Sequence, residues 1–204
     1  QIARAAYQPK LPKGLTGTVK AVAGAATQSV ADQEEIKKLF PNTYGMPLIK
    51  FENTDETVDF PAMNVGVILS GGQAPGGHNV ISGIFDGIKK LNKDSKLYGF
   101  ILGPGGLVDH NYMELTADII DEYRNTGGFD IIGSGRTKLE KEEQFEKGLE
   151  ILKELNIKAL VIIGGDDSNT NACVLAEYYA AKNCGVQVLS LIHISEPTRH
   201  AQIS

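Results

Sequence analysis

The sequence predicts an α/β fold, a Rossmann-like three-layer sandwich in which helices cover both faces of a mostly parallel sheet. Short apolar segments rich in β-branched residues recur along the chain, as in 159–163 (ALVII), and such segments are typical of buried parallel strands. Each is followed by a glycine-rich turn and then by apolar residues at helical spacing. The connections are too long for hairpins, so we expect parallel strands joined by right-handed crossovers.

Composition agrees with an ordinary globular protein. Of 204 residues, 42% are hydrophobic and 22% are charged, which suits one domain with an additional arm. The net charge of −5, without a basic stripe, argues against nucleic acid as a partner. No apolar run approaches the ~18 residues of a membrane span, so no membrane partner is expected. Cys173 and Cys184 lack a metal-type spacing and fit thiols in a reducing cytoplasm, the expected localisation.

Residues 1–57 are expected to form an N-terminal extension. Residues 1–30 show no strong periodicity, whereas 31–40 (ADQEEIKKLF) predict a short helix that ends before Pro41. We expect this extension to pack over the following domain or against a partner subunit.

The first strand of the domain is expected at 64–70 (NVGVILS), followed by a loop at 71–79 (GGQAPGGHN) and a helix with apolar residues from Val80 to Leu91. A strand, a glycine loop and a helix in this order form a phosphate-binding layout. The loop matches neither the Walker A pattern nor GxGxxG, and a plain tight turn is the alternative.

A second strand is predicted at 97–102, followed by a glycine-rich loop and a helix across 115–123. The segment 129–132 is read as a short strand that leads into the loop 133–138 (GSGRTK). Thr137 and Glu140 have capping-box spacing for the next helix, whose apolar face is formed by Phe145, Leu149, Leu152 and Leu155.

The strand at 159–163 ends in Gly164 and Gly165, and Asp166 and Asp167 follow, with Ser168 placed to cap a helix. A last strand is expected from Gly185 onward. Since carboxyl ends of parallel strands share one edge, the turns after Ser70, Ile132 and Ile163 should face the crevice where ligands bind in such sheets.

Asp166, Asp167 and Arg136 are the best candidates for chemistry. The carboxylates can hold a hard cation such as Mg²⁺, although they could also only complement the helix dipole. Arg136 suits bidentate contact with a phosphoryl group, and an ordinary surface arginine is the alternative. Lys138 is a weaker candidate, and His78 and His110 are read as polar or packing residues.

Together, GGQAPGGHN, GSGRTK and GGDDS resemble the phosphofructokinase family, and most of all its long-chain, pyrophosphate-dependent branch. The resemblance spans residues 61–188, and the lead-in before it is similar to the N-terminal extension of that branch. It implies a donor-binding domain at 58–188 and reversible phosphoryl transfer from pyrophosphate to the 1-hydroxyl of fructose 6-phosphate, with Mg²⁺ as cofactor. It also implies a homo-oligomer, or a hetero-oligomer with a regulatory subunit, for the full-length protein.

The resemblance implies a role for each motif residue. Gly71 and Gly72 would contact the diphosphate, Gly72 through its backbone, and Arg136 would stabilise charge on the transferring group. Asp166 would bind the metal, and the diphosphate site would include Asp167 and Ser168.

Asp167 stands where ATP-using relatives carry glycine. Its carboxylate would lie where the α-phosphate of ATP belongs, and two like charges ~4 Å apart repel by ~4 kcal/mol at an effective dielectric near 20. Pyrophosphate has no such extension, so Asp167 would exclude ATP and admit the shorter donor.

The chain departs from the family after Val188. The family's next loop carries the catalytic base, but no Asp follows Asp167 here, so the base is unassigned. We expect residues 189–204 to be a non-native tail that resembles translated adapter sequence, and the chain to be an inactive fragment.

Three rival interpretations stay open. An ATP-using kinase of the wider GGDG group would lack the upstream GGQAPGG loop, and a dehydrogenase would need GxGxxG with a downstream acidic residue. A non-catalytic regulatory subunit of the same fold would keep the phosphate site without turnover.

Overall fold

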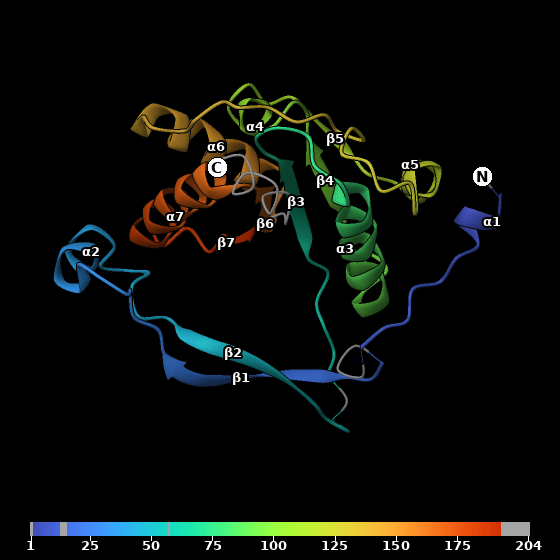
Figure 1. The fold of residues 1–204 in the computed structure, drawn as a ribbon, viewed down its shortest axis with the longest axis horizontal. Helices are drawn as coiled ribbons and strands as arrows, with labels where there is room; N and C mark the ends of the chain where they lie inside the picture. The colour runs from blue at the N-terminus through green and yellow to red at the C-terminus, as the bar shows by residue number, and fades with distance from the viewer. Residues whose placement is uncertain (1, 13–15, 57, 193–204) are drawn as a thin grey trace, which may run out of the picture. The chain divides into compact units, whose positions relative to one another are not determined.

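The computed structural model describes residues 2–12, 16–56 and 58–192. The chain divides into two compact units, one of residues 6–61 and one that joins residues 1–5 to the chain from Ala62 onward (Figure 1). The larger unit contains the α/β sheet, and the smaller one overlaps the predicted N-terminal extension over residues 6–57.

The smaller unit contains a hairpin that the sequence did not reveal. Strands β1 (Val19–Ala26) and β2 (Pro47–Asn53) pair antiparallel, and α2 (Gln33–Leu39) lies between them in sequence, which confirms the predicted helix. The first strand is rich in Ala with one Gly, residues with low strand propensity, so its pattern was too weak to recognise. Packing of this extension over the domain or a partner stays a prediction.

The larger unit is built on a five-stranded sheet of order β5-β4-β3-β6-β7. Strand β3 pairs parallel with β4 and β6, β6 pairs parallel with β7, and only β5 is antiparallel, against β4. The mostly parallel sheet is therefore confirmed. Its strands are β3 (Asn64–Leu69), β4 (Leu97–Phe100), β5 (Tyr112–Glu114), β6 (Ile157–Gly164) and β7 (Gln187–Ile192).

Helices cover both faces of this sheet, and each face has its own buried core. Along β3, Val65, Val67 and Leu69 belong to the core that includes α3 and α5 residues, whereas Ile68 and β4 residue Phe100 belong to the core that includes α4, α6 and α7 residues. This alternation is the two-residue period of a strand buried on both sides. The helices are α1 (Ile2–Ala5), α3 (Gly77–Leu91), α4 (Pro104–Val108), α5 (Ala117–Tyr123), α6 (Glu142–Glu154) and α7 (Asp166–Ala181).

The predicted strand at 129–132 is wrong. This segment is irregular, although Phe129 and Ile132 are buried in the core, so its apolar residues serve packing rather than sheet pairing. The nearest pairing is an isolated parallel bridge between Ser70 and Gly135. The short helix α4 and the short strand β5 were not predicted, because the glycines around Pro104 were interpreted as a loop.

Two predicted helix starts also differ. Helix α6 begins at Glu142, not after Thr137, and the Gln144 Oε1 atom accepts the Lys141 N–H at 3.0 Å, so the side-chain cap is displaced by four residues. Helix α7 begins at Asp166 after an N-cap at Gly165. Ser168 therefore lies inside the first turn and is not the cap.

Strand β7 confirms the expected last strand and runs past Val188 to Ile192. Residues 189–192 of the predicted tail thus take part in sheet pairing, and the rest of that tail lies outside the described residues. The predicted domain boundaries stay predictions. None of the helices within the described ranges combines the length and apolar character needed to span a membrane.

Tyr179 offers a test of core packing. Its side chain is buried against α6, and its hydroxyl is a buried polar atom without a hydrogen-bond partner among the described residues. Burial also raises the pKa of this phenol. Because an unsatisfied buried hydroxyl costs about 1–3 kcal/mol, we expect Tyr179→Phe to leave stability unchanged or raise it by about 1 kcal/mol.

Urea unfolding of the chain measures this effect. Tyr178→Phe is the matched control, since the Tyr178 hydroxyl lies 3.5 Å from carboxylates of Glu142 and Glu146 at the surface. A loss of stability on Tyr179→Phe greater than that of the control would show that the hydroxyl has a partner.

Candidate functional site

The carboxyl ends of β3 and β6 mark the point where the strand order reverses. From β3 the chain passes through α3 to β4 on one side, and from β6 it passes through α7 to β7 on the other. The two strands are neighbours, with Leu69 opposite Ile163. In open α/β sheets this switch point is where ligands bind.

Backbone contacts join the three glycine-rich turns at this edge. The Ser70 N–H donates to the Ile163 carbonyl at 2.8 Å, and the Gly71 N–H donates to the Gly135 carbonyl at 2.8 Å. Gly71 has φ +91°, a conformation that favours glycine. The turns after Ser70, Ile132 and Ile163 therefore meet, as the sequence predicted.

Arg136 lies beside the first glycine loop. A Cβ atom at Gly72 would be only 3.1 Å from the Arg136 Nη2 atom, so the absent side chain makes room for the guanidinium. Gly135 is also needed, because a Cβ there would clash with the Leu102 carbonyl. Arg136 is exposed, and its guanidinium has no hydrogen bond or ion pair with any described residue. This arrangement leaves a free, oriented cation at the ligand edge.

Asp166 and Asp167 occupy the first turn of α7, and both are exposed. Within the described ranges, no group of three or more His, Cys, Asp or Glu side chains could hold a metal ion by itself. A pair of carboxylates nevertheless fits Mg²⁺, which prefers oxygen ligands and usually completes its coordination with water and substrate phosphates. The donor set thus suits a metal that arrives with a phosphate ligand.

Ser168 is placed differently from the expected diphosphate ligand. Its hydroxyl is buried and donates to the Ser70 Oγ atom at 2.8 Å, so it links the first turn of α7 to the end of β3. What Ser168 can offer an anion is its backbone N–H, because N–H groups of a first helical turn have no partner inside the helix.

Sequence reasoning missed Ser70 as part of this site. Its only signal was a hydroxyl at the end of an apolar strand, directly before the glycine loop. Lys138 is exposed, and the His110 Nε2 atom lies 3.0 Å from the Lys147 carbonyl on α6. Both agree with ordinary surface roles.

Fold and site together define an α/β protein whose sheet switch point carries glycine-rich turns, an arginine unpaired among the described residues and two exposed carboxylates, the features of a candidate anion site. The sequence matches the Phosphofructokinase model over residues 64–194. The chain belongs to the phosphofructokinase family.

Comparison with individual proteins gives more detail. The chain is 67% identical over 188 residues to a pyrophosphate–fructose 6-phosphate 1-phosphotransferase of Porphyromonas gingivalis, covering 92% of this chain and 34% of that protein. It is 49% identical over 180 residues to subunit beta 1 of the enzyme of that name in Arabidopsis thaliana, covering 88% of this chain and 32% of the relative. The chain therefore spans about a third of the length of these curated relatives.

Solved structures support the fold. The crystal structure of a pyrophosphate-dependent phosphofructokinase from Nitrosospira multiformis superposes with a TM-score of 0.56 at 19% identity, covering 64% of this chain and 33% of the other.

Proposed function

We propose that this chain is the donor-binding part of a pyrophosphate-dependent phosphofructokinase, which transfers a phosphoryl group from pyrophosphate to fructose 6-phosphate and gives fructose 1,6-bisphosphate. The observation that carries the proposal is the meeting of three turns at the switch point, with Arg136 unpaired beside Gly72 and two carboxylates on α7. The names of the 67%- and 49%-identical relatives support the choice of substrates.

Each part of the edge has a role in this reaction. The backbone N–H groups of Gly72 and of the first turn of α7 would bind the diphosphate oxygens. Gly71 would line the site without donating, because its N–H is already bonded to the Gly135 carbonyl. Arg136 would neutralise the charge that develops on the transferring group, and Asp166 would hold Mg²⁺. Mg²⁺ held by Asp166 would supply charge neutralisation, and phosphoryl transfer depends mainly on positioning and neutralisation of charge.

Asp167 would select the donor. Its carboxylate has no hydrogen-bond or ion-pair partner within the part of the chain that the structure describes, so it is free to repel a longer polyphosphate. This supports pyrophosphate over ATP.

We also propose an oligomeric, cytoplasmic full-length enzyme. The Arabidopsis relative is named as a subunit, which supports an oligomer. Cys173 and Cys184 are free thiols, which suits a reducing compartment.

Calorimetric titration of the 204-residue chain tests donor binding. Mg-pyrophosphate is expected to bind at least roughly tenfold more tightly than Mg-ATP, because the α-phosphate of ATP meets Asp167. NAD should give no heat of binding. Tighter binding of ATP or NAD than of pyrophosphate would overturn the proposal.

Turnover needs a second experiment. A fusion of residues 1–188 to the remaining part of the Porphyromonas gingivalis relative should form fructose 1,6-bisphosphate from pyrophosphate. The 204-residue chain alone is the control, and activity of that chain would contradict its expected inactivity.

A further inference from the structure

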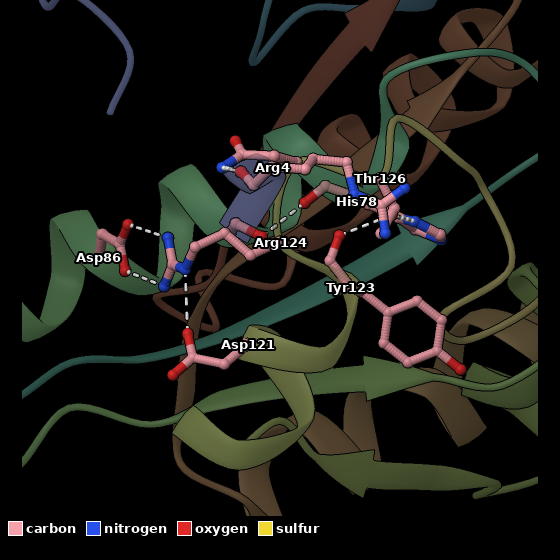
Figure 2. A network of polar contacts seen from close by, with 9 residues as sticks. Arg4, His78, Asp86, Asp121, Tyr123, Arg124 and Thr126 are labelled. Carbon is pink, nitrogen blue, oxygen red and sulfur yellow. Dashed lines mark hydrogen bonds and ion pairs between the residues drawn. The ribbon is translucent and has the colours of Figure 1, made fainter. Parts of the chain in front are cut away.

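His78, in the first turn of α3, is buried and makes an unusually complete set of contacts. Its Nε2 atom accepts the backbone N–H groups of Asp130 at 2.9 Å and Ile131 at 3.0 Å, and its Nδ1 atom lies 2.5 Å from the Thr126 hydroxyl. Its side chain is only 2% exposed. Figure 2 shows His78 beside Thr126 and Tyr123. From the sequence, His78 was interpreted as a polar or packing residue. Its burial agrees with that interpretation, which does not explain these contacts.

These contacts select one protonation state. Because Nε2 accepts two N–H groups, it carries no proton, so the proton of the neutral ring is on Nδ1 and is donated to Thr126. The Thr126 hydroxyl in turn donates to the Tyr123 carbonyl at 2.6 Å. Both backbone N–H groups are therefore satisfied only by a neutral imidazole, in competition with the contact of Nε2 with the Asp130 carboxylate at 2.9 Å.

The segment held by His78 leads to the candidate site. From Ile131 the chain runs five residues to Arg136, and the Gly135 carbonyl accepts the Gly71 N–H on the way. The Ile132 carbonyl accepts the Leu102 N–H at 2.9 Å. The turn that carries Arg136 is thus fixed between His78 at one end and the first glycine loop at the other.

Two glycines show that this contact is closely fitted. A Cβ atom at Gly128 would lie 2.6 Å from the His78 Cε1 atom, and one at Gly77 would clash with the Phe129 ring. The His78 N–H also donates to the Gly128 carbonyl at 2.9 Å. Residues 126–131 and the start of α3 therefore pack so closely that side chains at Gly77 and Gly128 would not fit.

The beginning of the segment is anchored separately. Arg124 Nη1 and Nη2 pair with the two carboxylate oxygens of Asp86 on α3 at 2.7 and 2.9 Å, and its Nε atom pairs with Asp121 at 2.9 Å (Figure 2). Loss of the His78 side-chain contacts would consequently loosen residues 130–131 locally without separating α5 from α3.

We propose that His78 is a positioning residue for Arg136, whose neutral imidazole holds residues 130–131, and with them the arginine turn, against the start of α3. This inference rests on the proposed function, because it gives a role in pyrophosphate binding to a residue that does not touch the ligand edge.

Protonation of His78 would oppose this arrangement. A proton on Nε2 would displace both backbone N–H groups, and the Asp130 carboxylate, 2.9 Å from Nε2, would become its partner. The Tyr123 ring packs edge-on against the imidazole, with ring centroids 4.9 Å apart. Burial lowers the pKa of His78 from its ordinary value of 6.5, with Asp130 acting in the opposite direction.

The sign of the pH effect follows from this lowered pKa. The unfolded chain binds a proton at His78 more readily than the folded chain does, so this group's contribution to stability is fully present above pH 6.5. The contribution is lost as the pH falls through the lower pKa of the folded state. The turn that carries Arg136 should therefore become less firmly held as the pH falls below the folded-state pKa of His78.

Amide hydrogen exchange on the 204-residue chain tests the inference. As the pH falls from about 7.5 through the lowered folded-state pKa of His78, protection factors at Asp130 and Ile131 should fall at least tenfold, while that of Ile68 in the central strand stays constant. Affinity for Mg-pyrophosphate, measured on the same samples, should fall in parallel.

Variants separate positioning from simple packing. His78→Gln places an amide oxygen near the Nε2 position and should keep both protected amides while losing their pH dependence. His78→Leu should lose the protection and weaken pyrophosphate binding about tenfold, and His110→Gln is the control that should change neither. Unchanged exchange at residues 130 and 131 in His78→Leu would overturn the inference.

Two further outcomes are informative. If His78→Leu does not fold, His78→Gln still decides, since acid-dependent exchange at residues 130 and 131 that persists in this variant would overturn the inference. If the unmodified chain binds no pyrophosphate, the proposed function fails, whereas the exchange data still test whether His78 holds the segment.

Discussion

Arg136→Ala is expected to lower kcat of the fusion enzyme by roughly 1,000-fold, the lower end of the range for arginines that stabilise transferring phosphoryl groups. The structure explains why one residue should matter so much. Arg136 is unpaired and lies against Gly72 at the switch point, so its charge is not already neutralised by protein. A loss of this size corresponds to about 4 kcal/mol of transition-state stabilisation.

Steady-state kinetics with pyrophosphate and fructose 6-phosphate measure this loss. Lys138→Ala, which removes an exposed cation two residues away, should change kcat less than about threefold. Arg136→Lys keeps the charge but not the planar pair of donors, so it should recover only part of the rate. Because Arg136 is exposed, its replacement should leave the unfolding midpoint of the chain nearly unchanged. Activity of Arg136→Ala close to that of the unmodified fusion would remove Arg136 from the mechanism.

The sequence predicted those parts of the fold in which local pattern and tertiary environment agree. Strands β3 and β6 are buried on both faces, and parallel strands in that position must be continuously apolar. Their apolar runs were therefore unambiguous. The glycine turns were equally readable, because Gly71 needs positive φ and Gly135 must accept a backbone at close range.

Errors arose where tertiary contacts override local pattern. The run 129–132 looks like a strand, but Phe129 and Ile132 fill the core under α3 and α5 while its backbone N–H groups are taken by His78. A side-chain acceptor contributed by another element leaves no local trace in sequence. The same reason hid the Ser70–Ser168 hydroxyl pair, whose members are far apart in the chain.

The three turns meet as predicted because their meeting depends on topology more than on side chains. Any parallel arrangement of β3 and β6 brings the residues after Leu69 and Ile163 together. Topology does not determine how the side chains at this edge are oriented. Whether Ser168 offers its hydroxyl or its N–H depends on burial, and here the hydroxyl is used internally.

Asp167→Gly is expected to raise the preference of the fusion enzyme for ATP over pyrophosphate by roughly 100-fold. Two like charges ~4 Å apart repel by ~4 kcal/mol at an effective dielectric near 20 and by ~1 kcal/mol in bulk water. The repulsion from an exposed carboxylate such as that of Asp167 lies between these two values. Asp167 makes no ion pair among the described residues that would weaken its field. The ratio of kcat/KM values for the two donors measures the change.

Asp167→Asn separates charge from bulk, because asparagine keeps the shape of the side chain and removes its charge. If repulsion excludes ATP, Asp167→Asn should gain most of the ATP activity that Asp167→Gly gains. If volume excludes ATP, only the glycine variant should gain it. Asp166→Asn is the control, since loss of the proposed Mg²⁺ ligand should weaken both donors alike. An unchanged donor ratio in both Asp167 variants would mean that selection lies elsewhere in the enzyme, and that the adjacent carboxylates serve the metal and the helix dipole only.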